Sequence, residues 1–496
     1  MNQPNVLLIM TDQQRWDALG CYGNDVIETP NLDWLASQGT IFENAYSPSP
    51  SCVPARAALL TGMDPWHTGI LGVGSSQGPM GVGFSHTLPG ELAKAGYHTQ
   101  GVGKMGFRPQ RALNGFHQTV LDESDQEIDR GFYSDYKQWF DKNKTGDYGI
   151  VDHGIGWNSW MARPYHAPEF LHPTNWTINE SLDFLKQRRD PSKPFFLKTS
   201  FTRPHSPYDA PDYYFHRYAE AAAIPKAKVG EWASMHDVKE DAVKPETWRG
   251  VRSDQEIHRA RAGYYGSIHH IDHQIGRLLS YLVKNKLFDN TLIIFTSDHG
   301  DMLGDHHLWR KTYAYEGSAH IPLIVKLPNA YTPMEKKVSE PVSLQDIMPT
   351  ILDSVSLAIP ESVDGKSMVP LIKREQVPWR EYLHGEHSTC YAEEQEMQYL
   401  TDGVYKYIWF PRTGMEQLFH LQDDPYECED LSEEPVFASK LDKWRQRLVS
   451  ILEKRDKGLT ENGQLVCQKG RPFLTSPHYR TRMEKTRMFN DSAFSS

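Results

Sequence analysis

Cys52 lies where the sequence predicts the first turn of a helix, and its surroundings suit a reactive side chain. Pro54 fits the first position of that helix, because its missing N–H costs nothing there, and Gly62 is placed to end it. Free N–H groups and the helix macrodipole favour anionic ligands and reactive forms of cysteine at such a point. Arg56 lies one turn further on, within reach of the same spot. The alternative is a small apolar cysteine buried under an ordinary helix.

Two predicted buried strands end in side chains suited to binding a cation. Asp12 and Gln13 follow the first strand, and Asp298 and His299 follow the second. In open α/β sheets ligands bind at the carboxyl ends of the strands, where an Asp and a His side by side can both reach a metal. An Asp at a strand end can equally cap the next helix, so each pair alone is only a candidate.

Lys104, His205 and Lys311 are three further candidates. Lys104 and His205 each follow a predicted strand, His205 in a loop flanked by prolines, and Lys311 follows the second Asp–His pair after a short loop. Taken singly, such a lysine is usually solvated and such a histidine usually exposed. Lys104 and His205 are candidates because each follows a strand, at the edge of the sheet where ligands bind.

Alternating strands and helices must position these residues. Short apolar runs predict strands, and longer amphipathic runs predict helices. The strands are expected at residues 5–10, 40–46, 97–102, 194–200, 291–297 and 321–327, and the helices at 30–36, 88–95, 175–188, 252–286 and 343–355. This order predicts an α/β fold whose parallel strands deliver the candidate residues to one edge of the sheet.

The character of the sequence changes after Pro378. Short strands at 381–386, 405–410 and 417–420 and a helix at 435–454 predict a small α+β unit. We therefore expect a catalytic domain over residues 1–375 and a C-terminal α+β subdomain over residues 376–496.

Composition limits the possible functions. Lys and Arg number 53 against 64 Asp and Glu, a net charge of −11, which argues against a general nucleic-acid or acidic-membrane binder. No apolar run approaches the ~20 residues of a membrane helix, and the first residues do not resemble a signal peptide. The five scattered cysteines do not suggest a disulfide framework. We expect a cytoplasmic protein; its oligomeric state stays open.

The run Cys52-Val53-Pro54-Ala55-Arg56, followed by Thr61-Gly62, resembles the signature of the type I sulfatases of the alkaline-phosphatase-like superfamily. The run from Ser297 to Gly300, then Lys311 and Glu316-Gly317, resembles the second conserved region of that family, and residues 418–425 resemble its C-terminal segment. The resemblance extends in order from Asp12 to about Leu431. It implies an α/β/α sandwich with a mostly parallel central sheet and a smaller C-terminal α+β subdomain.

The resemblance also implies a mechanism. A formylglycine-generating (sulfatase-maturing) enzyme would oxidise Cys52 to formylglycine, whose hydrate attacks the sulfur of a sulfate ester, and whose second hydroxyl then expels sulfate. One divalent cation would complete the site, with Ca²⁺ expected and Mg²⁺, Mn²⁺ or Zn²⁺ as alternatives. Its ligands would be Asp12, Gln13, residue 52, Asp298 and His299. The implied catalytic residues are Cys52, Arg56 to steady it, Asp298 as base, Lys104, and His205 and Lys311 at the leaving oxygen.

The sequence departs from the common family pattern at four positions. Gln13 replaces a second Asp, His299 replaces an Asn, and Met105-Gly106 follows Lys104 where many sulfatases have Trp-His. The Asp-Gln and Asp-His pairs look like the branch that holds choline-sulfatases and phosphonate monoester hydrolases. We therefore expect an arylsulfatase-like enzyme that hydrolyses a small-molecule or carbohydrate sulfate monoester. The alternatives are a phosphonate monoester or phosphodiester hydrolase with the same nucleophile, and a non-catalytic binding protein with unmodified Cys52.

Overall fold

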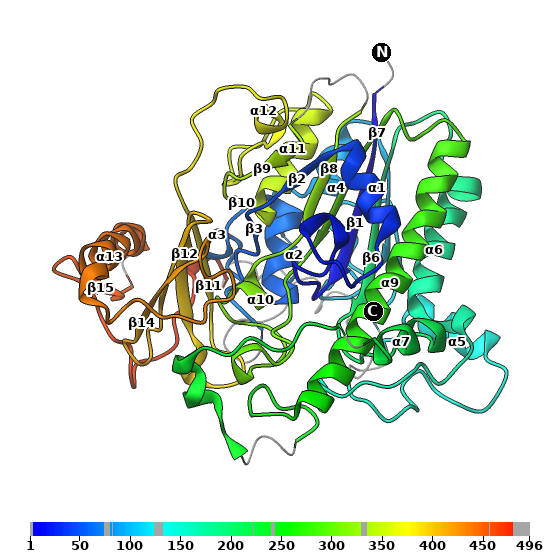
Figure 1. Ribbon diagram of the computed structural model, residues 1–496. Coiled ribbons are helices and arrows are strands. Elements are labelled where there is room, and N and C mark those ends of the chain that lie inside the picture. The colour runs from blue at the N-terminus through cyan, green and yellow to red at the C-terminus, as the bar shows by residue number, and fades with distance from the viewer. Residues whose placement is uncertain are drawn as a thin grey trace, which may run out of the picture.

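The computed structural model describes residues 3–73, 80–81, 83–123, 132–221, 223–239, 244–328, 335–455 and 457–479. Its centre is an eight-stranded sheet with the order β5-β4-β6-β1-β7-β8-β2-β9 (Figure 1). The neighbours pair in parallel except at β8, which runs antiparallel to both β7 and β2. The strands are β1 (Asn5–Asp12), β2 (Thr40–Phe42), β4 (His98–Gly103), β5 (Gln118–Leu121), β6 (Phe195–Pro204), β7 (Thr291–Ser297), β8 (Leu323–Lys326) and β9 (Lys337–Val338).

Helices cover both faces of this sheet, because its central strands are apolar on both sides. In β1, Leu7 and Ile9 face one core, while Val6, Leu8 and Met10 face the other. The first core is closed by helices α1 (Pro30–Gln38), α6 (Pro173–Asp183), α7 (Asp212–Ala219) and α9 (Asp254–Lys284). The second is closed by α2 (Cys52–Thr61), α4 (Leu88–Lys94) and α11 (Ile347–Ser354). The predicted α/β/α sandwich is therefore confirmed.

The 31-residue helix α9 is the longest element on the first face, and Figure 1 shows it running beside α6. Ser253 and Glu256 form a capping box at its start, which satisfies free N–H groups of the first turn. The predicted apolar stripe, including Ile268, Ile271 and Ile275, is fully buried. No described helix has the length and apolar character needed to cross a bilayer.

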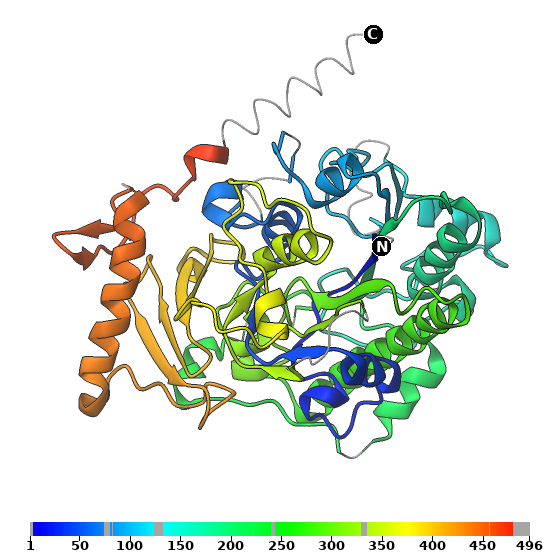
Figure 2. The same cartoon turned by 90° about the horizontal axis from the view of Figure 1, so that it is seen from above.

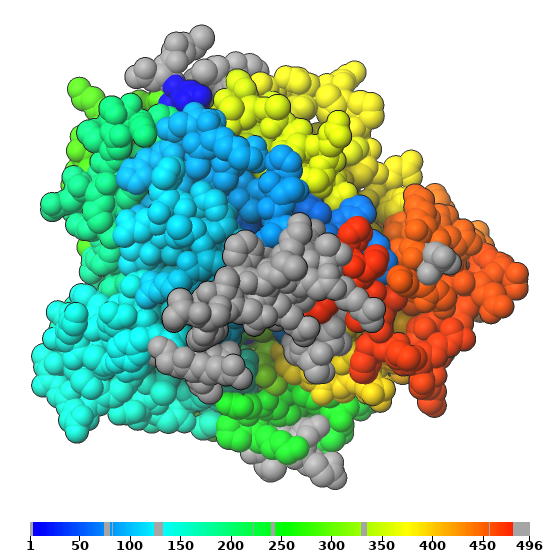
Figure 3. All heavy atoms as spheres, turned by 180° about the vertical axis from the view of Figure 1, so that it is seen from behind, coloured from blue at the N-terminus to red at the C-terminus, as the bar shows by residue number. Residues whose placement is uncertain are grey.

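The C-terminal part forms a second, antiparallel sheet of β11 (Leu383–His387), β12 (Met397–Thr401), β13 (Tyr405–Trp409) and β14 (Glu416–His420). Helix α13 (Ala438–Leu452) covers its outer face, as the view from above makes clear (Figure 2). The α+β composition is as expected, although β12 was not predicted from the sequence. Residues 457–479 then return to the catalytic domain, and Figure 3 shows this red part of the chain against blue atoms of the N-terminal part. Ser476 Oγ donates there to the Trp66 carbonyl at 2.7 Å. The division of the chain after residue 375 stays a prediction.

Shorter elements connect these layers. The short helices and strands are β3 (Ala45–Tyr46), α3 (Pro65–Thr68), α5 (Asp135–Asn143), the π-helical turn Phe184–Arg188, α10 (Glu316–Ala319), β10 (Val342–Ser343), α12 (Val369–Ile372), β15 (Thr460–Glu461) and β16 (Gln464–Leu465). Single 3-10 turns lie at Gly20–Tyr22, Glu169–Leu171, Glu231–His236, Asp305–His307, Leu344–Asp346, Glu393–Gln395, Pro435–Phe437 and Glu453–Arg455.

Two local predictions were wrong. Helix α2 begins at Cys52 rather than at Pro54, which is its third residue, where a missing N–H is equally harmless. Residues 40–46 form two strands, β2 and β3, in different sheets instead of one. The chain therefore leaves the central sheet before it reaches Ser51, the N-cap of α2.

Candidate active site

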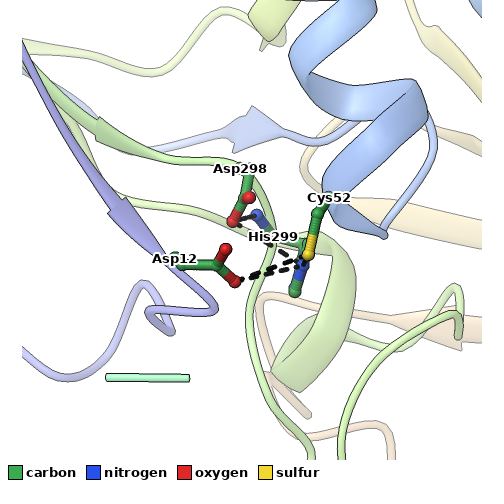
Figure 4. Close-up of side chains that lie close together, drawn as sticks. All are labelled: Asp12, Cys52, Asp298 and His299. Atoms are coloured by element: carbon green, nitrogen blue, oxygen red, sulfur yellow. Dashed lines mark hydrogen bonds and ion pairs between the residues drawn. The ribbon is translucent and has the colours of Figure 1, made fainter. Parts of the chain in front are cut away.

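The site is built at the carboxyl end of the two central strands. Asp12 is the last residue of β1, and Asp298 and His299 directly follow β7. These strands are parallel neighbours with Thr11 opposite Ser297, so their ends lie level. Cys52, the first residue of α2, approaches from above (Figure 4).

The side chains of Asp12, Cys52, Asp298 and His299 converge on one point. Each offers an atom that lies within 4.8 Å of the others. Cys52 Sγ lies 3.3 Å from His299 Nε2 and 3.6 Å from Asp12 Oδ1 (Figure 4). All four residues are buried. Two carboxylates and an imidazole in this arrangement suit a divalent cation.

Arg56 lies on the far side of both carboxylates. Its Nε is 2.8 Å from Asp298 Oδ2, and its Nη2 is 3.2 Å from Asp12 Oδ2. Nη1 donates to the Lys104 carbonyl and to Ser200 Oγ. Arg56 pairs with the Oδ2 atoms of Asp12 and Asp298. The Oδ1 atoms of the same carboxylates face Cys52 and His299. Arg56 thus orients the candidate metal ligands, whereas the sequence suggested that it steadies residue 52.

His299 presents a lone pair to this point. Its Nδ1 lies 2.9 Å from the Gly300 carbonyl, which can only accept, so Nδ1 carries the proton and Nε2 faces Cys52. Burial lowers the pKa of His299 and keeps the ring neutral. A neutral imidazole with a free Nε2 is the form that binds metals.

Lys311 occupies the other side of Cys52. Its Nζ lies 3.3 Å from Cys52 Sγ, 3.0 Å from Gln13 Oε1 and 2.6 Å from His205 Nε2. His205 Nδ1 donates to the Ser206 carbonyl at 2.8 Å, so its Nε2 accepts from the Lys311 ammonium. Burial, reinforced by the Lys311 charge, holds the pKa of His205 well below its usual range. Lys311 is therefore the proton donor of this pair.

Lys104 also lies in the site. Its Nζ is 3.0 Å from Asp12 Oδ2 and 4.0 Å from Cys52 Sγ. Burial alone would raise the pKa of Asp12, but Lys104 and the other nearby cations hold it well below its usual range. Asp12 is therefore ionised, as a metal ligand must be.

The surroundings of Cys52 disfavour the thiolate form of the unmodified side chain. Burial, with the nearby Asp12 charge, raises the pKa of Cys52 to about 12, against the opposing charges of Lys104 and Lys311. Desolvation and the carboxylate act against activation of the unmodified thiol by the helix N-terminus, and that activation stays a prediction. These two effects disfavour the thiolate at neutral pH.

Gln13 is held by Asp301, a residue that the sequence did not single out. Gln13 Nε2 donates to Asp301 Oδ2 at 2.5 Å, and the Tyr208 hydroxyl donates to the same oxygen. This orients Gln13 Oε1 toward Lys311. The direct binding of a cation by Gln13 stays a prediction. The one sign of this role in the sequence is that Asp301 follows Asp298 by three residues.

His387 is a second residue that the sequence did not identify. It lies at the end of β11, and its Nε2 is 2.7 Å from Ser51 Oγ, next to Cys52. The Glu386 N–H also donates to the Pro48 carbonyl at 2.9 Å. The C-terminal sheet therefore supports the loop that carries residue 52, a contact across more than 300 residues of sequence that has no local signal.

The chain is similar to known proteins in its sequence and in its fold. The sulfatase family model matches residues 4–357, and the model of the N-sulphoglucosamine sulphohydrolase C-terminal region matches residues 304–454. The fold is similar to that of a phosphonate monoester hydrolase of Agrobacterium radiobacter, with a TM-score of 0.75, 23% identity and coverage of 94% of this chain and 100% of the other.

Two curated relatives cover most of the chain. An arylsulfatase of Clostridium perfringens is 42% identical over 96% of this chain and 100% of its own length. A choline-sulfatase of Rhizobium meliloti is 29% identical over 87% of this chain and 83% of its own. With the family model and the site described above, these relatives show that the chain belongs to the sulfatase family of sulfuric ester hydrolases.

Proposed function

We propose that this enzyme hydrolyses the sulfate monoester of a small molecule or carbohydrate, with formylglycine at position 52 and one divalent cation. The observation that carries the proposal is the place of Cys52 Sγ, between the cation ligands Asp12 and His299 and the proton donor Lys311. Since the thiol pKa of about 12 argues against the thiol as nucleophile, Sγ stands in for an oxygen of the formylglycine hydrate.

The residues present fit a cation. Asp12, Asp298 and His299 would hold it, together with the side chain of residue 52, and the mixed donor set accepts Ca²⁺, which we propose, as well as Mg²⁺, Mn²⁺ or Zn²⁺. When bound, it would lower the pKa of the hydrate hydroxyl and neutralise charge on the sulfuryl oxygens.

The protein's own groups manage the protons. Asp298, within 4.8 Å of the Cys52 side chain, is the proposed base for the hydroxyl at residue 52. Lys311 would give its proton to the departing alkoxide, because it carries the proton that the neutral His205 accepts. His205 holds the Lys311 ammonium group in position. The positive charge of Lys104 offsets the negative charge of Asp12.

We also propose that a sulfatase-maturing enzyme modifies Cys52 and that the protein is cytoplasmic. The support for the compartment is that all five cysteines are unpaired, as is usual in reducing compartments.

Two measurements test this function. The first is hydrazide trapping and peptide mass spectrometry across residue 52 in protein made by its native host. The second compares kcat/KM for an aryl sulfate, the matching aryl phosphonate and the matching phosphodiester, all with one leaving group. We expect the aldehyde and a preference for the sulfate. An unmodified thiol would overturn the mechanism, and a preference for either phosphorus ester would favour the phosphonate monoester or phosphodiester hydrolase instead.

A further inference from the structure

Arg310, the residue before Lys311, is a buried cation for which the described residues provide no carboxylate partner. Its exposed fraction is 7%. Nη2 donates to the Glu246 carbonyl at 2.7 Å, while the buried Nε has no hydrogen-bond partner among the described residues. A buried charge without a counter-ion is costly. A guanidinium placed in this way favours an anionic ligand.

Arg310 is tied to the active site through its backbone. Its N–H donates at 2.9 Å to Asp301 Oδ1, and the other oxygen of Asp301 holds Gln13. The next residue, Lys311, places its ammonium group 3.3 Å from Cys52 Sγ. The backbone of Arg310 therefore lies beside the site.

The Arg310 guanidinium also belongs to a row in which two stacked aromatic rings lie between two cations. Its carbon lies 4.3 Å from the centre of the Tyr391 ring, and Trp248 stacks on Tyr391 with 6.2 Å between centroids. The guanidinium of Arg249 lies 4.3 Å from the Trp248 ring. We call Arg310, Tyr391, Trp248 and Arg249 the cation–aromatic wall. Such a wall suits a flat ring that carries negative charge.

The backbone around Lys311 is strained. Arg310 has a φ of 67° and Thr312 a φ of 83°, in the left-handed region that favours glycine. The Thr312 N–H donates to the Pro50 carbonyl at 2.8 Å, which helps to hold this geometry against the loop before Cys52. Such strain persists where the surrounding structure enforces it, typically at ligand sites.

We propose that Arg310 determines specificity by binding a second negative charge on the leaving group. The substrate class is a sulfate ester of a ring that also bears a carboxylate or another sulfo group. This inference rests on the proposed sulfatase function and narrows its substrate. The competing explanation is that Arg310 only holds Tyr391 and the backbone at Glu246 in place.

The test uses matched aryl sulfates and the complete, formylglycine-bearing protein. The probes are 3-carboxyphenyl sulfate, 3-sulfophenyl sulfate and the uncharged 3-carbamoylphenyl sulfate. For each anionic probe, the ratio of its kcat/KM to that of the carbamoyl probe is measured in wild type, Arg310→Leu, Arg310→Lys and Arg217→Leu. Comparing ratios between proteins cancels the intrinsic reactivities of the leaving groups.

We expect wild type to prefer at least one anionic probe, and Arg310→Leu to lower that ratio by a factor of ten or more. Arg310→Lys should restore part of it, and Arg217→Leu, which removes an exposed arginine paired with Glu28, should change it by less than threefold. An equal loss on all probes would overturn the proposal in favour of a structural role.

If Arg310→Leu does not fold, measurements on the wild-type protein alone still test the proposal. Product inhibition of wild type by 3-hydroxybenzoate should exceed that by 3-hydroxybenzamide, and equal inhibition together with equal kcat/KM overturns the proposal. Failure of the sulfatase function looks different, because the aldehyde-bearing wild type would then hydrolyse none of the three sulfates.

Discussion

Lys311 Nζ lies 2.6 Å from His205 Nε2, and the proton of this contact belongs to the lysine, because His205 Nδ1 donates to a backbone carbonyl. The same ammonium group lies 3.3 Å from Cys52 Sγ. Lys311 therefore contacts both residue 52, the proposed nucleophile, and His205, which the sequence suggested as a second proton donor.

This relationship predicts how the loss of Lys311 depends on the leaving group. Lys311→Met should lower kcat/KM by roughly 10²–10⁴-fold for alkyl sulfates, whose alkoxides need a proton, and much less for sulfates of acidic phenols. The measurement is the slope of log kcat/KM against leaving-group acidity in wild type and variant. His205→Gln should steepen the slope less, since Lys311 remains. An unchanged slope in Lys311→Met would show that the lysine acts elsewhere.

The nucleophile can be tested by removing only its second hydroxyl. Cys52→Ser keeps one hydroxyl, so we expect a single sulfate transfer to that hydroxyl without turnover, because no second hydroxyl can expel the sulfate. Intact-mass analysis after incubation with an aryl sulfate should detect the sulfated chain. Cys52→Ala is the matched control and should stay unmodified. Sustained turnover by Cys52→Ser would contradict the formylglycine mechanism.

The sequence predicts the residues of this site whose role follows from a local pattern, but not those whose contacts join segments far apart in the chain. Asp12 and Asp298 end apolar strands, a local pattern, and parallel pairing then brings them together. Cys52 meets them because its helix covers the same edge. The residues that support the site escaped prediction, since their contacts depend on distant segments.

Asp301 and His387 show why these supporting residues could not be predicted. Asp301 acts on Gln13 and Arg310 only because the chain after it folds back through left-handed residues such as Leu303, with a φ of 47°. His387 reaches Ser51 only because a separate sheet docks on the catalytic domain. Neither event has a periodic signal in the sequence.

His299 should set the choice of metal. An imidazole nitrogen favours Mn²⁺ and Zn²⁺ more than an amide oxygen does, so His299→Asn should lower the bound Zn²⁺ to Ca²⁺ ratio by about tenfold. The ratio is measured by elemental analysis after dialysis against equal concentrations of both ions. Asp64, in the exposed Asp64–His67–Asp364 cluster, gives the control Asp64→Asn, which should leave the ratio unchanged. An unchanged Zn²⁺ to Ca²⁺ ratio in His299→Asn would show that His299 does not bind the ion.

Asp305 should make stability depend on acid pH. Its two oxygens each lie 2.7 Å from a guanidinium nitrogen, of Arg15 and Arg261. Burial alone would raise the pKa of Asp305, but these two cations lower it to about 2. Since this lies below the unfolded value of about 3.9, the stabilisation is complete above that value and is lost as the pH falls through about 2.

Asp305→Asn tests this directly, because it leaves Arg15 and Arg261 buried without their counter-ion. At pH 7 the free energy of unfolding should fall by roughly 3–5 kcal/mol, and the difference from wild type should shrink as the pH approaches 2. Urea unfolding at a series of pH values measures it. Glu28→Gln, which breaks the exposed pair with Arg217, should cost less than about 1 kcal/mol. A pH-independent loss in Asp305→Asn would mean that packing, and not charge, is responsible.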